Sequence, residues 1–154
     1  MTKVLLASLL MVVSSHSFAA TTGTLLLKGQ VGQVLSISVT AESIASTLPL
    51  DVTQLDTKVA TINEKSNSST GYKVKVSSAN LGSLKRTSGT ELFPYSLKYG
   101  GQQVNLSGSQ SFSYPTSATV DVNKDVTIAY TGVPAGSMVA GEYVDTVTFE
   151  ISAN

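Results

Sequence analysis

The sequence predicts an all-β sandwich of about seven to nine short strands. Apolar and polar residues alternate with a period of two in several short segments, which are separated by serine, glycine, asparagine and proline residues. No stretch shows a sustained helical period. Only 13% of the 154 residues are charged and 12 are glycine, which is typical of a β-rich protein with a weakly charged surface.

The predicted strands share this alternation and lie between turn residues. In chain order they are residues 24–31, 34–40, 57–64, 72–77, 92–99, 102–106, 126–131 and 143–151. Residues 57–64 are the weakest candidate, and residues 52–60 are expected to form at most one helical turn because threonine and valine disfavour helix. In residues 72–77 the apolar side chains face one side and the lysines the other, so one face of this strand is expected to be wet.

Glycine and proline residues define the connections. Pro94 makes residues 92–99 an edge or bulged strand, because proline cannot donate to a ladder. Gly100 and Gly101 predict a hairpin turn, since glycine accepts the positive φ that such turns require. Residues 66–71 and 132–141 are expected to form loops. Residues 107–117 are expected to form a loop or a short strand, and Val120 and Val122 another short strand.

Residues 1–19 are predicted to be a cleaved secretory signal peptide. Lys3 supplies the positive charge, and the apolar run over residues 4–13 is too short to cross a bilayer. Ser17-Phe18-Ala19 offers small residues at the two positions that a signal peptidase reads, so cleavage is expected after Ala19, with Ala20 as the alternative. Export from the cytoplasm follows from this prediction.

The composition of the remaining chain argues against catalysis. The single histidine is His16, and there is no cysteine, so the usual zinc sites and the Ser-His-Asp and Cys-His arrangements cannot form. No glycine-rich phosphate-binding motif occurs. We therefore predict that the protein is not an enzyme and uses no cofactor or metal. Its formal net charge of zero provides no field to attract nucleic acid, so no nucleic-acid partner is expected.

The segment that follows the signal is apolar and alternating. Leu25, Leu27, Gly29 and Val31 lie on one face, and residues 32–33 join them to the first strand of the domain. Chain termini are usually polar and frayed, so a segment with this pattern should not remain in water.

Two interpretations of this segment are open. In the first, it continues directly into residues 34–39 as an edge strand of its own domain. In the second, it inserts into a neighbouring molecule. Fully extended, residues 20–31 span about 40 Å, which is enough to cross another sandwich. Gly29 favours insertion, because a glycine within a strand suits the close approach of a partner.

The last predicted strand resembles the C-terminal end of pilin-like proteins of the spore coat protein U and archaic chaperone–usher type. The family pattern of Ala-Gly, Tyr, Asp-Thr-Val and alternating apolar residues matches Ala140-Gly141-Glu142-Tyr143-Val144-Asp145-Thr146-Val147-Thr148. Residues 71–76, the pair Leu97 and Tyr99, and the secretion signal also fit. Most of these families carry an early disulfide that this chain cannot form. The cysteine-free colonisation-factor pilins are therefore the second resemblance.

This resemblance implies an incomplete immunoglobulin-like β-sandwich with an N-terminal donor strand. It divides the chain into the signal peptide 1–19, the donor-strand extension 20–33 and the sandwich domain 34–154. The exposed groove beside the last strand is covered first by a periplasmic chaperone. At an outer-membrane usher, the N-terminal strand of the next subunit replaces the chaperone. The residues that the resemblance assigns are the donor positions Leu25, Leu27, Gly29 and Val31, and the acceptor edge and chaperone contact Val147, Phe149 and Ile151.

The implied function is that of a pilus or fimbrial subunit in surface attachment or biofilm. Its partners would be copies of itself or sister pilins, the chaperone and the usher. It would pass through the periplasm to a cell-surface fimbrium. The alternative is a monomeric secreted adhesin or binding module with a complete sandwich, in which the N-terminal segment pairs within its own domain.

Overall fold

The computed structural model describes residues 21–115, 117 and 119–154. The predicted signal peptide and both of its cleavage positions lie outside these residues. The chain divides into two units at Val31, and within the first unit residues 21–31 form neither helix nor strand. The second unit, Gly32–Asn154, contains every assigned element. None of the described helices is long and apolar enough to span a membrane.

The described part of this domain is almost entirely β-structure, which confirms the predicted fold class. Its two short 3-10 helices are η1 (Ser43–Ser46) and η2 (Ala135–Ser137). Its strands are β1 (Leu35–Ala41), β2 (Gln54–Ser66), β3 (Tyr72–Ser78), β4 (Ser83–Arg86), β5 (Leu92–Pro94), β6 (Ser96–Tyr99), β7 (Gln102–Val104), β8 (Ser109–Tyr114), β9 (Val120–Tyr130), β10 (Tyr143–Val144) and β11 (Val147–Ala153).

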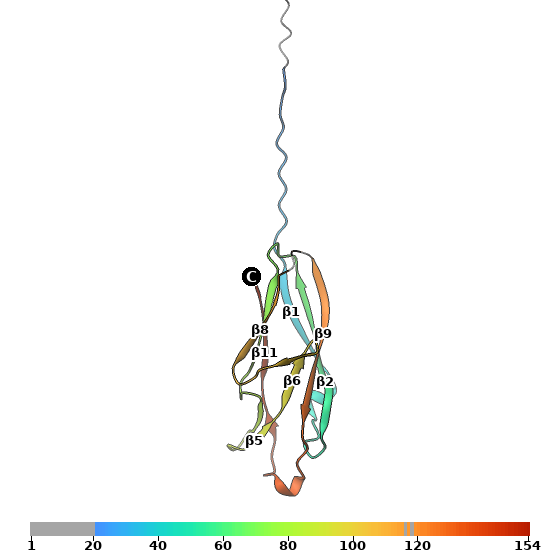
Figure 1. Ribbon diagram of the computed structural model, residues 1–154, viewed down its shortest axis with the longest axis vertical. Coiled ribbons are helices and arrows are strands. Elements are labelled where there is room, and N and C mark those ends of the chain that lie inside the picture. Colours follow the sequence, from blue (N-terminus) through green and yellow to red (C-terminus); the bar gives the residue numbers. More distant parts are fainter. Residues whose placement is uncertain (1–20, 116, 118) are drawn as a thin grey trace, which may run out of the picture. The chain divides into compact units, whose positions relative to one another are not determined.

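The strands form two principal antiparallel sheets and one small sheet (Figure 1). The strand orders are β1-β2-β9-β6-β7, β11-β3-β8 and β10-β4-β5. The first two sheets pack against each other through Tyr99 of β6, whose ring lies 5.4 Å from that of Phe112 and 5.5 Å from that of Phe149. Aromatic side chains from both sheets thus build a shared core, as in a β-sandwich.

The clearest alternating segments fold as predicted. On β3, Tyr72, Val74 and Val76 are buried, whereas Lys73 and Lys75 are exposed, which confirms the strand with one wet face. On β9, the predicted apolar face of residues 126–130 is buried. Gly100 and Gly101 adopt φ values of 55° and 79° between β6 and β7, which confirms the hairpin.

Residues 52–60 form no helical turn, and most of them belong to a strand. Strand β2 begins at Gln54, runs for 13 residues and pairs with both β1 and β9. Residues 57–64 looked weak because their core-facing positions include Glu64. Its carboxylate is buried and accepts a hydrogen bond from the Tyr72 hydroxyl. A charged residue thus occupies a core position near the C-terminal end of the longest strand.

Four further expectations change in detail. Residues 92–99 form two strands in different sheets, although β5, which ends at Pro94, is an edge strand as expected. Strand β4 was not predicted, because it is only four residues long and ends in the basic pair Lys85-Arg86. The expected last strand is interrupted between β10 and β11. No strand is assigned over residues 24–31, so the strand expected there is absent from the single chain.

Candidate functional site

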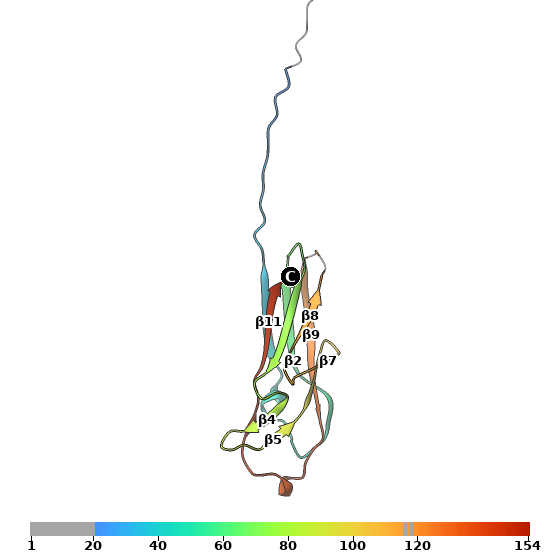
Figure 2. The ribbon, with the colours of Figure 1, turned by 60° about the vertical axis from the view of Figure 1, so that its left-hand side comes forward.

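Strands β1 and β11 each leave one edge open. Among the described residues, β1 pairs only with β2, and β11 pairs only with β3. The two strands belong to different sheets but contact each other along one side of the sandwich, where Figure 2 shows them side by side. The domain therefore has two unpaired strand edges next to each other.

The backbone groups that face the open edge of β11 can be identified from its ladder. In an antiparallel ladder, alternate residues direct both N–H and C=O toward the same neighbour. The Thr146 carbonyl accepts from the Ala79 N–H, and the Asn154 N–H donates to the Gly71 carbonyl, so even-numbered residues face β3. The groups of Val147, Phe149 and Ile151 consequently face the open edge.

The same reasoning applies to β1. Val34 and Glu42 make backbone hydrogen bonds to the β2 side, so even-numbered residues face β2 and odd-numbered ones face outward. The outward backbone groups on β1 therefore belong to Leu35, Ile37 and Val39. Both edges offer a row of donors and acceptors, which is the pattern that an added strand needs.

Apolar side chains between these edges are incompletely covered. Val147, Phe149 and Ile151 pack against the core but are only partly buried. On β1, Leu35 and Ile37 are similarly half-buried, and Val39 is 56% exposed. A protein gains stability by removing such side chains from water, so this face is suited to a further apolar partner.

A groove runs between the two edges into the core. The part of the groove next to the strands, its upper part, has a volume of about 360 Å³. It is lined by Val39 and Ala41 from β1, Val147 and Phe149 from β11, and core residues such as Leu97. The part next to the loops, its lower part, has a volume of about 740 Å³ and is lined mainly by residues 45–51 and 138–145. The two parts adjoin each other, because they share the lining residues Ala45, Leu48, Leu84 and Asp145.

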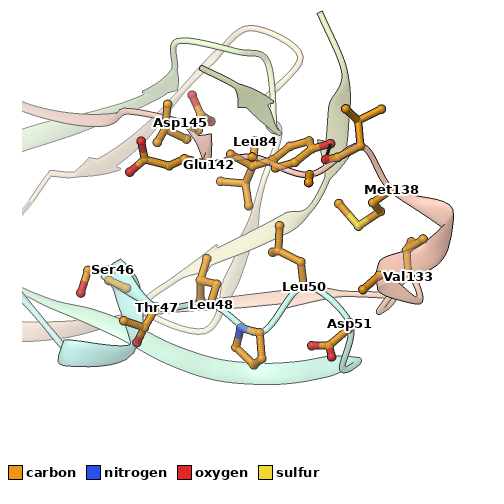
Figure 3. Close-up of a pocket in the computed structure, with 18 residues that line it drawn as sticks. Ser46, Thr47, Leu48, Leu50, Asp51, Leu84, Val133, Met138, Glu142 and Asp145 are labelled. Carbon is orange, nitrogen blue, oxygen red and sulfur yellow. Dashed lines mark hydrogen bonds between the residues drawn. The ribbon is translucent and has the colours of Figure 1, made fainter. Parts of the chain in front are cut away.

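The lower part of the groove is shown in Figure 3. Leu48 and Leu50 lie on one wall, Leu84 lies on the opposite wall, and Met138 and Val133 lie toward one end. These loop residues were not predicted to belong to a site, although the Leu48-Pro49-Leu50 run outside any alternating segment was an available signal. The contribution of β1 was also missed, because residues 34–40 were predicted only as a strand of the domain.

Asp145 fixes the chain between β10 and β11. Its Oδ2 atom accepts hydrogen bonds from the Ser78 hydroxyl and the Tyr95 hydroxyl, both at 2.6 Å. Its Oδ1 atom accepts from the backbone N–H groups of Asn80 at 2.9 Å and Thr146 at 2.8 Å. Burial, followed by the hydrogen bond to Asp145, raises the pKa of Tyr95. The acidic residue of the pilin-like motif thus ties the start of β11 to the β3–β4 turn.

The predicted acceptor residues come together on β11. Val147 and Phe149 line the groove, and Ile151 follows them on the same face. The predicted donor residues lie in the other unit, where Leu25, Leu27 and Val31 are more than 80% exposed and no atom lies within 4 Å of a Cβ built on Gly29. Their role as a donor strand stays a prediction.

The described residues contain no group of three or more His, Cys, Asp or Glu side chains that could hold a metal ion. No protein-family model matches the chain, and no curated protein matches it either. The resemblance to pilins therefore depends on the residues quoted above.

Proposed function

We propose that this protein is a structural pilus or fimbrial subunit that polymerises head-to-tail by donor-strand exchange through a chaperone–usher pathway. The observation that carries the proposal is the apolar groove between the open edges of β1 and β11. A sandwich with a gap at this place lacks one strand. Its exposed strand edges would promote aggregation unless another chain covered them. Surface attachment or biofilm formation would be the role of the resulting fibre.

The occupant that best fits the groove is residues 25–31 of a second copy. This segment and β11 are each seven residues long, so one strand can cover the whole edge. Its face of Leu25, Leu27, Gly29 and Val31 has the two-residue spacing of the acceptor face. Each of the three large apolar side chains would contribute about 1.5–3 kcal/mol on burial.

The same edge would receive a periplasmic chaperone before assembly. The outward backbone groups of Val147, Phe149 and Ile151 would pair with any added strand, so a chaperone strand and a donor strand would compete for them. Because the segment and the groove are different surfaces, repeated exchange gives an open chain of subunits.

The decisive experiment separates the two faces of the N-terminal segment. The double variant Leu25→Asp/Leu27→Asp should fold and bind the chaperone but should not polymerise, because two charges cannot enter the groove. Leu26→Asp is the matched control, since Leu26 lies on the opposite face of the extended segment. It should polymerise like the unaltered chain in sedimentation and electron microscopy.

Two results would contradict the proposal. One is a double variant that still forms fibres. The other is an unaltered chain that purifies as a stable monomer and never captures a synthetic peptide of residues 20–31. The second result would instead favour the monomeric adhesin or binding module.

A further inference from the structure

Asn67 binds the residues that immediately precede β1. The Val34 N–H donates to Asn67 Oδ1 at 2.6 Å, and Asn67 Nδ2 donates to the Gly32 carbonyl at 2.9 Å. The Asn67 N–H also donates to the Val34 carbonyl at 3.1 Å. One residue therefore satisfies three backbone groups within Gly32–Val34.

These bonds continue the β1–β2 pairing backwards along the chain. The last ladder pair of the two strands is Leu35 with Ser66, and Asn67 opposite Val34 is the next position. The side-chain amide of Asn67 has the same donor and acceptor as a peptide group, so it acts as one further unit of the β2 backbone. Gly32 does not have a positive φ. Residues 32–34 thus follow the course of β1 instead of forming a turn.

A turn at this place is what pairing within one chain would need. If residues 25–31 folded back along the open edge of their own β1, residues 32–34 would be the whole hairpin loop. Three-residue hairpin loops are common and require a residue with positive φ, a role that Gly32 suits. Nothing in the length of the connection prevents such self-pairing.

We infer that Asn67 is a positioning residue that opposes this self-pairing and so keeps the N-terminal segment available to a second copy. A hairpin through residues 32–34 must break the hydrogen bonds from Asn67 to Gly32 and Val34. This inference rests on the proposed function, because it concerns the same groove. Substitution of the Asn67 side chain removes the two side-chain hydrogen bonds, which should favour the self-paired form by about tenfold.

The test uses full-length chains and a synthetic peptide of residues 20–31 as the probe. Asn67→Leu has nearly the same size but loses the two side-chain hydrogen bonds, to the Val34 N–H and to the Gly32 carbonyl. We expect this variant to show hydrogen-exchange protection over residues 25–31 in the monomer and to capture the peptide about tenfold less than the unaltered chain. Asn67→Asp keeps the acceptor for Val34 but loses the donor to Gly32, so an intermediate effect is expected.

Two controls separate positioning from damage. Asn105→Leu removes an exposed asparagine elsewhere in the domain, whose Oδ1 accepts from Ser107, and should leave capture unchanged. Adding Leu25→Asp/Leu27→Asp to Asn67→Leu prevents self-pairing, so peptide capture should recover to the level of the unaltered chain. Failure to recover would mean that Asn67→Leu damages the groove, and the inference would be wrong.

The remaining outcomes also decide the inference. Equal capture by Asn67→Leu and the unaltered chain, with no protection over residues 25–31, would overturn the inference and leave the proposed function standing. If the Leu25→Asp/Leu27→Asp chain with Asn67 intact captures no peptide, the groove does not accept this strand. The proposed function and the inference would then both fail.

Discussion

At the scale of single residues, Glu64 places a carboxylate inside the sandwich. Its Oε2 atom accepts the Tyr72 hydroxyl at 2.6 Å and lies 3.2 Å from Nζ of Lys124. The same ammonium lies 3.4 Å from the centre of the Tyr114 ring. Because Glu64 and Lys124 come from one sheet and the tyrosines from the other, this cluster joins the two layers of a domain that has no disulfide.

Removal of the Lys124 ammonium should therefore lower the stability of the domain strongly. Lys124→Met leaves a buried carboxylate without its cation, and we expect the free energy of unfolding in urea to fall by about 3 kcal/mol. The double variant Lys124→Met/Glu64→Leu should recover most of this loss. Lys65→Met is the control, because its ion pair with Asp121 is exposed and should contribute less than about 1 kcal/mol. A double variant as unstable as the single one would contradict the role of the buried pair.

Buried tyrosines predict a loss of stability in alkali. Burial, followed by the hydrogen bond to Glu64, raises the pKa of Tyr72, and burial followed by Asp145 raises that of Tyr95. The folded state thus holds these protons more tightly than the unfolded state does. Their contribution to stability is complete below the unfolded pKa of about 10 and is lost as the pH rises above it. Urea unfolding between pH 8 and 11 should show this decline, and Tyr95→Phe should make it shallower.

At the scale of elements, the open edge of β11 can be tested without disturbing its ladder to β3. The N–H of Ile151 faces the open edge, so Ile151→Pro removes a donor that β3 does not use. We expect peptide capture to fall well below that of Ile151→Ala, with similar stability of the two variants. Ser152→Pro removes an N–H that faces β3 and should destabilise the domain itself. Equal capture by Ile151→Pro and Ile151→Ala would show that the backbone edge is not used.

The strands that the sequence predicts best are those whose two faces differ most. Tyr72–Ser78 and the second half of β9 combine buried apolar positions with polar ones, so alternation alone identified them. Strand β2 was underestimated because a buried ion pair makes a core position look exposed. The groove residues Val147 and Phe149 were identified, but the groove residues of β1 and of the loops were not. These parts of the groove form where segments that are distant in the sequence pack together, and the local alternation of apolar and polar residues does not show such packing.

At the scale of the whole molecule, occupation of the groove should stabilise the domain. A peptide of residues 20–31 present at 100 times its dissociation constant should add about 2.7 kcal/mol to the free energy of unfolding. For a domain of this size, that corresponds to a rise in melting temperature of roughly 10 °C. Thermal denaturation of the Leu25→Asp/Leu27→Asp chain measures the rise, and a peptide with Leu27→Asp is the control. An equal shift with both peptides would indicate binding outside the groove.

The separation of segment and groove on one chain also sets a stoichiometry. In a linear series of n copies, n − 1 grooves are filled, so one terminal copy retains an empty groove and the opposite one a free segment. The proportion of unfilled sites falls as the series lengthens, and only a closed ring would have none. In the proposed fibre, a short series of copies would therefore have the largest proportion of unfilled grooves and free segments. A terminal protein that lacks either the segment or the groove would be needed to seal each end.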